Sequence, residues 1–313
     1  MARKPRLHFP GAVYHVTLQG NARQQVFTDA IDRTRFLLLI QEGIEKFGHR
    51  VHAYCLLADR LRLVVEVDEV PLARIMQQLG FRYTRWFNDW HGQIGHLFQG
   101  RYKAILIDPE QYLLPLVRDL HVNPLRERLA ADPMHYPWSS HRAYCGRETV
   151  PWLSRERTFL GIEDTGIRAL MKFHAYVNEG LTPAETSDFS TGGSYDPRIL
   201  GEEDFVRGVM KLSRQKYRPK IGAERVDRLI QERFRLTEQE LAAPGKNRAC
   251  ADARACWAWL YLETGCATLT TLGDRLGRDV SSLSSAVRRL QLKAKTDPAV
   301  ADRLQKLLNR LQR

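Results

Sequence analysis

The sequence predicts an α+β domain, built as an antiparallel sheet with helices on one face, followed by an all-α domain with a helix-turn-helix. Two observations lead to this prediction. In the first half of the 313-residue chain, runs of alternating apolar residues stand between segments of helical periodicity. In the second half only the helical period is found, and glycines separate its segments.

Strands and helices are expected in the first half in the order β-α-β-β-α-β-α, which is typical of a small sheet covered by helices. β-branched and aromatic residues alternate in the strand runs, and two of these runs flank a turn at Asp59. Pro71 and Pro109 suit the first turn of a helix, and the second of these helices is expected to end before Pro124. The expected strands are 12–18, 51–58, 60–67 and 102–107, and the expected helices are 29–47, 71–90 and 109–123.

The second half is expected to be helical, with Gly265 and Gly277 ending helices or turning between them. Residues 269–290 fit a helix-turn-helix, because a short helix and a glycine turn precede a Ser-rich start to an amphipathic helix. The expected helices are 224–235, 250–264, 269–276, 281–294 and 299–312.

The charge distribution indicates two basic blocks and a polyanionic partner. The chain carries a formal charge of +12, which divides into +6 for residues 1–162, −3 for 163–200 and +9 for 201–313. The acidic middle includes 181–197, a stretch rich in Thr, Ser, Gly and Pro that is typical of a linker. We therefore expect an α+β domain at 1–162, a connecting helix and polar linker at 163–223, and a helical domain at 224–313.

Composition excludes several classes of protein. A hydrophobic fraction of 43% with 27% charged residues excludes wholesale disorder. No apolar run approaches the roughly 20 residues of a membrane span, and the basic N-terminus lacks the apolar core of a signal peptide. The five cysteines form no CxxC pair, and an odd number suits a reducing compartment. We expect a cytoplasmic, nucleoid-associated protein that binds nucleic acid and no membrane, with a monomer as the favoured state.

The first block resembles the REP-associated tyrosine transposases of the IS200-like, His-hydrophobic-His superfamily. The resemblance covers about 150 residues, with its motifs in order. It implies an α+β fold that binds DNA hairpins bordered by single strands, and that cuts one strand with a tyrosine and a divalent metal. The matching segments are YHVTLQGNARQQVF (14–27), AYCLLADRLRLVV (53–65), GHLFQGRYKA (95–104), YLLPLVRDLHVNPLR (112–126) and YPWSSHRAYCG (136–146).

This chain departs from that family at each of the positions that carry the reaction. The resemblance implies two metal-binding histidines where Arg60 and Arg62 stand, and a tyrosine nucleophile where Asp119 stands. A guanidinium group has no lone pair to offer and stays protonated, so it cannot ligate a cation. Gln19, where the family usually has Arg, is a smaller departure, whereas Asn123 is retained. We therefore expect loss of the family reaction, and no metal or cofactor.

Several side chains near these positions admit two interpretations. Arg60 and Arg62 either grip a DNA phosphate in place of the metal or pair with Asp59, Asp119 or Glu66. Asp59 and Asp119 form either a new metal pair or, by default, salt bridges. Tyr112 is either a relocated nucleophile, about 10 Å along the helix from position 119, or a packing residue. Four histidines lack ligand spacing on one element and are interpreted as ordinary core or surface residues: His52, His91, His96 and His121.

The second block resembles the DNA-binding domain of the bacterial chromosomal replication initiator, DnaA. The shared runs are VDRLIQERFRLTEQEL (226–241), ADARACWAWLYLETG (251–265) and TLTTLGDRLGRDVSSLSSAVRRL (268–290). The resemblance implies that Arg254 enters a minor groove, whereas Arg278, Asp279, Ser281, Ser282 and Ser285 read a major groove. Val280 departs from the usual His, and no GxxxxGK[ST] motif accompanies the domain. Phosphate neutralisation around that helix is expected from Arg275, Arg278, Arg288 and Arg289.

These observations predict a domesticated, catalytically inactive, transposase-derived protein that regulates transcription by binding specific DNA. Duplex DNA is the expected partner of the helical domain, and hairpin or single-stranded DNA that of the first domain. Three alternatives stay open. One is an active nickase or transposase with a relocated nucleophile. The second is an adaptor that binds RNA or protein, and the third is a helical packing module whose arginines form a solvated face.

Overall fold

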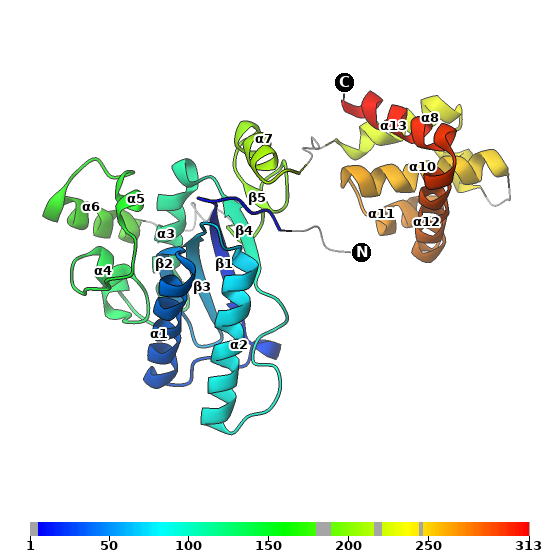
Figure 1. Ribbon diagram of the computed structural model, residues 1–313. Coiled ribbons are helices and arrows are strands. Elements are labelled where there is room, and N and C mark those ends of the chain that lie inside the picture. The colour runs from blue at the N-terminus through cyan, green and yellow to red at the C-terminus, as the bar shows by residue number, and fades with distance from the viewer. Residues whose placement is uncertain (1–5, 180–188, 216–220, 244–246, 313) are drawn as a thin grey trace. The chain divides into compact units, whose positions relative to one another are not determined.

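The computed structural model describes residues 6–179, 189–215, 221–243 and 247–312. The chain divides after residue 217 into two compact units (Figure 1). Each unit has its own apolar core. Of the expected linker, residues 180–188 lie outside the described residues. Within the expected connecting segment 163–223, Phe189, Ile199 and Val206 belong to the core of the first unit. This part of the segment therefore packs with the first unit.

The first unit follows the predicted order of strands and helices and then continues with short helices. Asp29 accepts a hydrogen bond from the backbone N–H of Asp32 and thereby caps the first long helix. The elements are β1 (Val13–Gln19), α1 (Ala30–Phe47), β2 (Arg50–Leu56), β3 (Arg60–Glu66), α2 (Leu72–His91), β4 (Lys103–Ile107), α3 (Pro109–Arg126), α4 (His141–Tyr144), α5 (Glu156–Phe159), α6 (Gly166–Glu179), β5 (Ile199–Leu200) and α7 (Glu203–Leu212), with 3-10 turns at Asn21–Arg23 and Pro133–His135.

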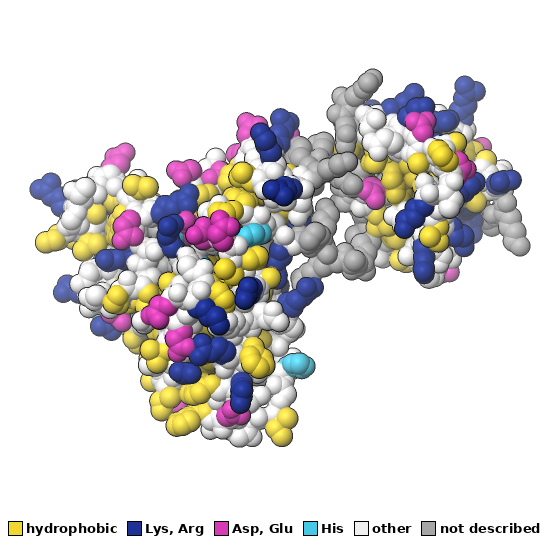
Figure 2. Space-filling model, in the orientation of Figure 1, with side chains coloured by type: hydrophobic (Ala, Val, Ile, Leu, Met, Phe, Trp, Pro, Cys, Tyr) yellow, Lys and Arg dark blue, Asp and Glu magenta, His cyan; other side chains and the backbone are white. Residues whose placement is uncertain are grey.

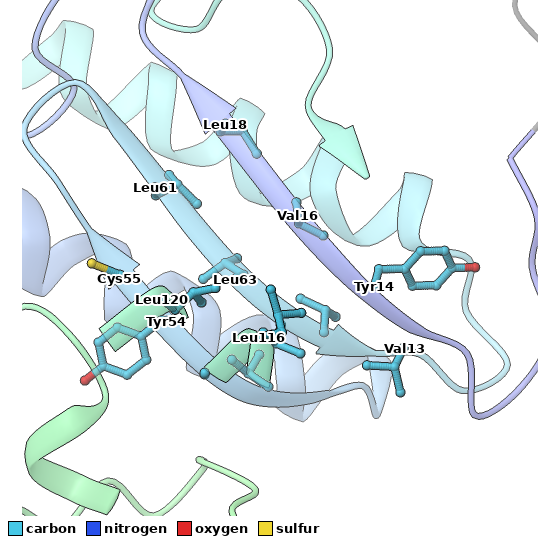
Figure 3. Packing of buried hydrophobic residues seen from close by; sticks show 14 of the residues in the cluster. Val13, Tyr14, Val16, Leu18, Tyr54, Cys55, Leu61, Leu63, Leu116 and Leu120 are labelled. Carbon is cyan, nitrogen blue, oxygen red and sulfur yellow. The ribbon is translucent and has the colours of Figure 1, made fainter. Parts of the chain in front are cut away.

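The strands form one sheet in the order β2-β3-β1-β4-β5, and the α+β class is confirmed. Two details differ from the prediction. Helices α1 and α2 cover one face while α3 lies on the other, where Leu116 and Leu120 face the sheet (Figures 1 and 3). The physical reason is that β1 and β2 are buried on both faces along most of their length, which requires cover on both sides. In addition, β5 pairs with β4 in parallel, so the sheet is mixed.

Helix α3 continues beyond the point where the sequence predicted its end. It passes through Pro124 and stops at Arg126. Pro124 has no N–H with which to bond the carbonyl of Leu120, one turn earlier. The side-chain amide of Asn123 donates to that carbonyl at 3.4 Å and to the Asp119 carbonyl at 2.9 Å. A side-chain donor thus replaces the missing backbone donor, and the helix keeps its last turn.

The second unit is helical, as predicted. Gly265 and Gly277 adopt φ values of 68° and 58° and end α10 and α11, which confirms their predicted role. The short α9, opened by a capping box between Thr237 and Glu240, is additional to the predicted helices. The elements are α8 (Ala223–Phe234), α9 (Glu238–Ala242), α10 (Arg248–Thr264), α11 (Leu269–Leu276), α12 (Val280–Thr296) and α13 (Pro298–Gln312). In the described ranges, no helix has both the length and the apolar character needed to cross a bilayer.

Candidate functional site

Arg60 and Arg62, which stand where the resemblance implies metal ligands, lie on β3 and project from the same face of the sheet. Arg60 is opposite Gln19 of β1, and Arg62 is opposite Thr17. Residues two apart on a strand point the same way, so both guanidinium groups lie on the face that α3 covers. Helix α3 carries Asp119 toward this face, and the structure thereby brings together the three positions that the sequence singled out.

Arg62 binds Asp119 directly. Its Nη2 lies 2.7 Å from Oδ2 of Asp119, and the two side chains are only 13% and 10% exposed. Arg62 also donates from Nε to Nε2 of His15 over 3.0 Å. Because a guanidinium N–H can only donate, the lone pair of His15 is at Nε2. The proton is then at Nδ1, which donates to the Phe189 carbonyl at 2.8 Å.

Arg60 and Arg126 complete an ion-pair network around the same place. Arg60 binds Oδ1 of Asp59 at 2.9 Å and also pairs with Glu127. Arg126 pairs with Asp119 from the other side. Three guanidinium groups therefore meet three carboxylates, and their formal charges cancel.

Of the two interpretations of Arg60 and Arg62, the contacts are those of the pairing alternative. Arg60 binds Asp59, and Arg62 binds Asp119. For the two aspartates, the contacts are therefore those of salt bridges and not of a metal pair. Glu66, which was also considered, is engaged elsewhere. Its carboxylate accepts from His52 at 2.9 Å and from Arg157 at 3.1 Å, and it pairs with Arg50 at 2.6 Å.

The other side chains near the site have structural contacts. Tyr112 is half-buried, and its ring meets that of Phe189 edge-on, with centroids 6.5 Å apart. Asn123 serves the backbone of α3, as described above. Gln19 is opposite Arg60, and its carbonyl accepts from the N–H of Gln99 at 2.8 Å. Tyr112 thus has the contacts of a packing residue.

The four histidines considered from the sequence have ordinary surroundings, except that His121 leads to a cluster that sequence reasoning missed. His52 and His91 pair with carboxylates, and His96 is exposed. His121 is fully buried, with its Nδ1 3.3 Å from Nδ1 of His141. His141 in turn lies beside Cys145 and His174. The available signal was the i, i+4 spacing of His141 and Cys145, which places both on one helical face.

In the second unit, α12 presents the predicted DNA-reading residues to solvent. Leu283, Val287 and Leu290 bury one face of this helix in the core. Asp279 occupies its N-cap position without capping through its side chain. The opposite face carries the exposed residues Ser281, Ser282, Ser285, Arg288 and Arg289. Figure 2 shows Lys and Arg side chains spread over the visible face of each unit.

The other three predicted DNA-binding arginines have contacts within the unit. Arg254 is only 8% exposed and donates to the carbonyls of Cys250 and Leu241. Arg278 donates to the Ala243 carbonyl at 2.9 Å. Burial, and secondarily the charge of Arg278, lower the pKa of Arg254. Within the described ranges, neither Arg254 nor Arg278 lies within salt-bridge distance of a carboxylate, so the like charges stand together.

Arg275 differs from these two because carboxylates hold it firmly. It bonds Glu238 with two parallel contacts of 2.8 Å, and Asp227 and the Tyr261 hydroxyl at the same distance. These contacts raise the pKa of Arg275, chiefly through Glu238. The structure therefore places Arg275 in an internal network that joins α8, α9, α10 and α11, apart from the exposed side chains of α12.

Comparison with known proteins supports the first resemblance over part of the chain. The family described as "Transposase IS200 like" matches residues 9–114, a range that contains Arg60 and Arg62 and ends before Asp119. A solved REP-associated tyrosine transposase bound to a REP hairpin matches with a TM-score of 0.40 and 14% sequence identity, over 50% of this chain and 98% of that one. No curated protein matches this sequence significantly. The resemblance of the second unit to the initiator domain stays a prediction.

Proposed function

We propose that this chain is a transposase-derived DNA-binding protein that does not cut DNA by the family's reaction and acts as a sequence-specific transcriptional regulator. The observation that carries the proposal is the buried ion pair between Arg62 and Asp119. One partner stands where the resemblance implies a metal ligand, and the other where it implies the nucleophile. In this chain the two residues bind each other.

The chemistry of the network argues against a divalent metal at this place. A metal would have to displace guanidinium groups that offer no lone pair and repel a cation. The carboxylate of Asp119 already accepts from Arg62 and Arg126 on its two oxygens. The formal charges of the six side chains also cancel, so this network offers little net attraction for a phosphate.

The second unit supplies the features expected of a duplex reader. The exposed serines near the start of α12 are small enough for close approach, and can exchange hydrogen bonds with phosphates or base edges. Arg254 and Arg278 donate to backbone carbonyls only two residues apart, those of Leu241 and Ala243, which places two positive charges together near the start of α12. A phosphate there would relieve their mutual repulsion, and the positive helix dipole would favour it further. These features support sequence-specific binding through α12.

Genome-wide immunoprecipitation of the full chain from its native host tests the regulatory part of the proposal. Discrete peaks that share one sequence motif are expected, and the exposed α12 residues should be needed for them. A matched strain carrying Arg310→Ala, an exposed arginine of α13, should keep the peaks. Absence of DNA enrichment would instead favour an adaptor for RNA or protein.

The catalytic part is tested by incubating the full chain with hairpin-bearing single-stranded DNA and Mg²⁺ or Mn²⁺. We expect no covalent protein–DNA adduct on denaturing gels. An adduct would contradict the inactive assignment, and the Tyr112→Phe variant then identifies the nucleophile. Loss of that adduct in Tyr112→Phe would establish a relocated tyrosine.

A further inference from the structure

Three side chains that can bind metal meet between α4 and α6 in the first unit. Nε2 of His141 lies 3.0 Å from Nδ1 of His174 and 3.4 Å from Sγ of Cys145. The three ligand atoms all lie within 4.8 Å of one another. His141 is fully buried, whereas Cys145 and His174 are half-buried. The cluster is therefore held by the interior and open to solvent on one side, so that an ion has a route to it.

We propose that His141, Cys145 and His174 bind a zinc ion through Nε2, Sγ and Nδ1. Two imidazole nitrogens and one thiolate form a borderline-soft set of the kind that Zn²⁺ takes in proteins. Tetrahedral Zn²⁺ with such ligands sets neighbouring donor atoms about 3.3–3.8 Å apart. The observed separations of 3.0 and 3.4 Å are slightly shorter, so a small outward movement of the side chains would admit the ion.

The groups behind His141 suit a metal ligand. A ligating nitrogen must be unprotonated, so His141 would carry its proton on Nδ1 and donate it to Nδ1 of His121 at 3.3 Å. His121 would then carry its own proton on Nε2 and donate to the Ser140 hydroxyl at 2.8 Å. That hydroxyl can donate in turn to the Tyr54 carbonyl at 3.4 Å. Each donor in this series of hydrogen bonds has an acceptor when Nε2 of His141 offers its lone pair to an ion.

His174 has a matching partner on its far side. Its Nε2 lies 3.2 Å from Nδ2 of Asn178, one helical turn later. When Nδ1 of His174 binds the ion, Nε2 carries the proton and needs an acceptor. Half a turn of the Asn178 amide about its last torsion presents Oδ1 in place of the NH₂ group. Both histidines thus have a residue that can hold the required tautomer.

The protonation states determine what binding releases. The tautomer with the proton on Nδ1 of His141 leaves the Nε2 lone pair available to the ion. Without the ion Cys145 is a thiol. Binding breaks its S–H bond, forms the Zn–S bond and releases the proton to solvent.

A tetrahedral ion needs a fourth ligand. The cluster supplies three protein ligands within 4.8 Å of one another, so a water molecule would take the fourth position. The bound ion would tie α4 to α6 beside His121 of α3. The site would therefore brace the helices added to the sheet, independently of any DNA-binding role.

Cobalt(II) tests the proposal with the tag-free full chain, because it occupies zinc sites and absorbs visibly. One Co²⁺ per chain is expected, with a thiolate-to-cobalt charge-transfer band that one equivalent of Zn²⁺ abolishes. The Cys145→Ser variant should lose the band. The Cys266→Ser variant, which removes a half-buried thiol of the second unit, should keep it. Absence of the band in the unmodified protein, or its survival in Cys145→Ser, overturns the proposal.

A second readout covers the case in which a variant alters folding. The apo forms of the unmodified chain, of Cys266→Ser and of His174→Gln are compared by circular dichroism and thermal unfolding, with and without Zn²⁺. Zinc should raise the Tm of the unmodified chain and of Cys266→Ser. For His174→Gln, the same rise in Tm should need a zinc concentration at least ~10-fold higher. Equal zinc responses in all three proteins would show that the cluster is only a hydrogen-bond network.

Discussion

Arg62 of β3 and Asp119 of α3 form an ion pair in which Nη2 lies 2.7 Å from Oδ2. Neither side chain has much access to water. Arg62 also donates to His15, and Asp119 also pairs with Arg126. The pair therefore joins the sheet to the helix at the centre of the candidate site. Loss of Asp119 would remove the carboxylate that compensates the largely buried charge of Arg62, whereas loss of Arg62 would leave Asp119 with Arg126 alone.

A double-mutant cycle on this pair is expected to show strong coupling. Arg62→Ala and Asp119→Ala should each lower the free energy of unfolding of the first unit by roughly 2–4 kcal/mol. The double variant should be more stable than the sum predicts by about 1–3 kcal/mol. Urea unfolding followed by circular dichroism measures this. The exposed pair Arg85–Asp89 is the control and should couple by no more than about 0.5 kcal/mol, whereas additivity at Arg62 and Asp119 would contradict the prediction.

Glu66 should make the first unit sensitive to acid. The hydrogen bond from His52, with help from Arg157 and against the effect of burial, lowers its pKa from 4.5 to about 2. A carboxyl whose pKa is lower in the folded state stabilises fully above its unfolded value, and that stability is lost as pH falls from about 4.5 toward 2. The loss should be on the order of 2–3 kcal/mol. Urea unfolding between pH 3 and 6 measures it, and Glu66→Gln should be less stable at pH 6 and show a flatter pH dependence.

Arg275 is expected to act on stability rather than through DNA contacts. Arg275→Ala removes contacts with Asp227 and Glu238 and should lower the free energy of unfolding of the second unit by roughly 1–3 kcal/mol. Trp257 lies beneath this guanidinium group, with 5.2 Å from Cζ to the ring centroid, so its fluorescence can follow the transition. Arg275→Lys should recover little, because Lys cannot make the two parallel bonds to Glu238. Unchanged stability together with weakened DNA binding would reverse this assignment.

Specific DNA binding should depend on α12 more than on the arginines of β3. The double variant Arg278→Ala with Ser282→Ala is expected to weaken binding to a selected site by about 10- to 100-fold. Arg60→Ala should have a smaller effect, because Asp59 and Glu127 already engage this side chain. Quantitative gel-shift titration of folded proteins measures both. Equal losses would count against the helix-turn-helix as the element of specificity.

Arg288 should contribute to DNA affinity through its charge on phosphates and not through contacts with bases. The slope of log affinity against log salt is negative, and Arg288→Ala is expected to make it less steep by about one unit. The effect should be similar on specific and unrelated duplexes. Titrations at several salt concentrations measure the slope. Arg310→Ala, which removes an exposed arginine from α13, serves as the control and should leave the slope unchanged. A sequence-dependent loss would assign base contact to Arg288.

Much of the fold could be predicted because it depends on local patterns. The strand runs, the helices after Pro71 and Pro109, and the ends of α10 and α11 at glycine follow from period and backbone preference. The end of α3 was predicted too early, because the amide of Asn123 compensates for Pro124. Cover on both faces of the sheet was also missed, since alternation indicates which residues share a face but not what packs against it.

The sequence by itself determined that Arg60, Arg62 and Asp119 stand where the resembling family has its metal ligands and nucleophile. It also identified α12 as the helix with small polar residues at its start. Only the tertiary structure decided that Arg62 binds Asp119, that Arg275 is held by Asp227 and Glu238, and that His141, Cys145 and His174 converge. The physical reason is that periodicity specifies the faces of each element, whereas these contacts join elements far apart in the chain. Their geometry is set by how the helices and the sheet pack.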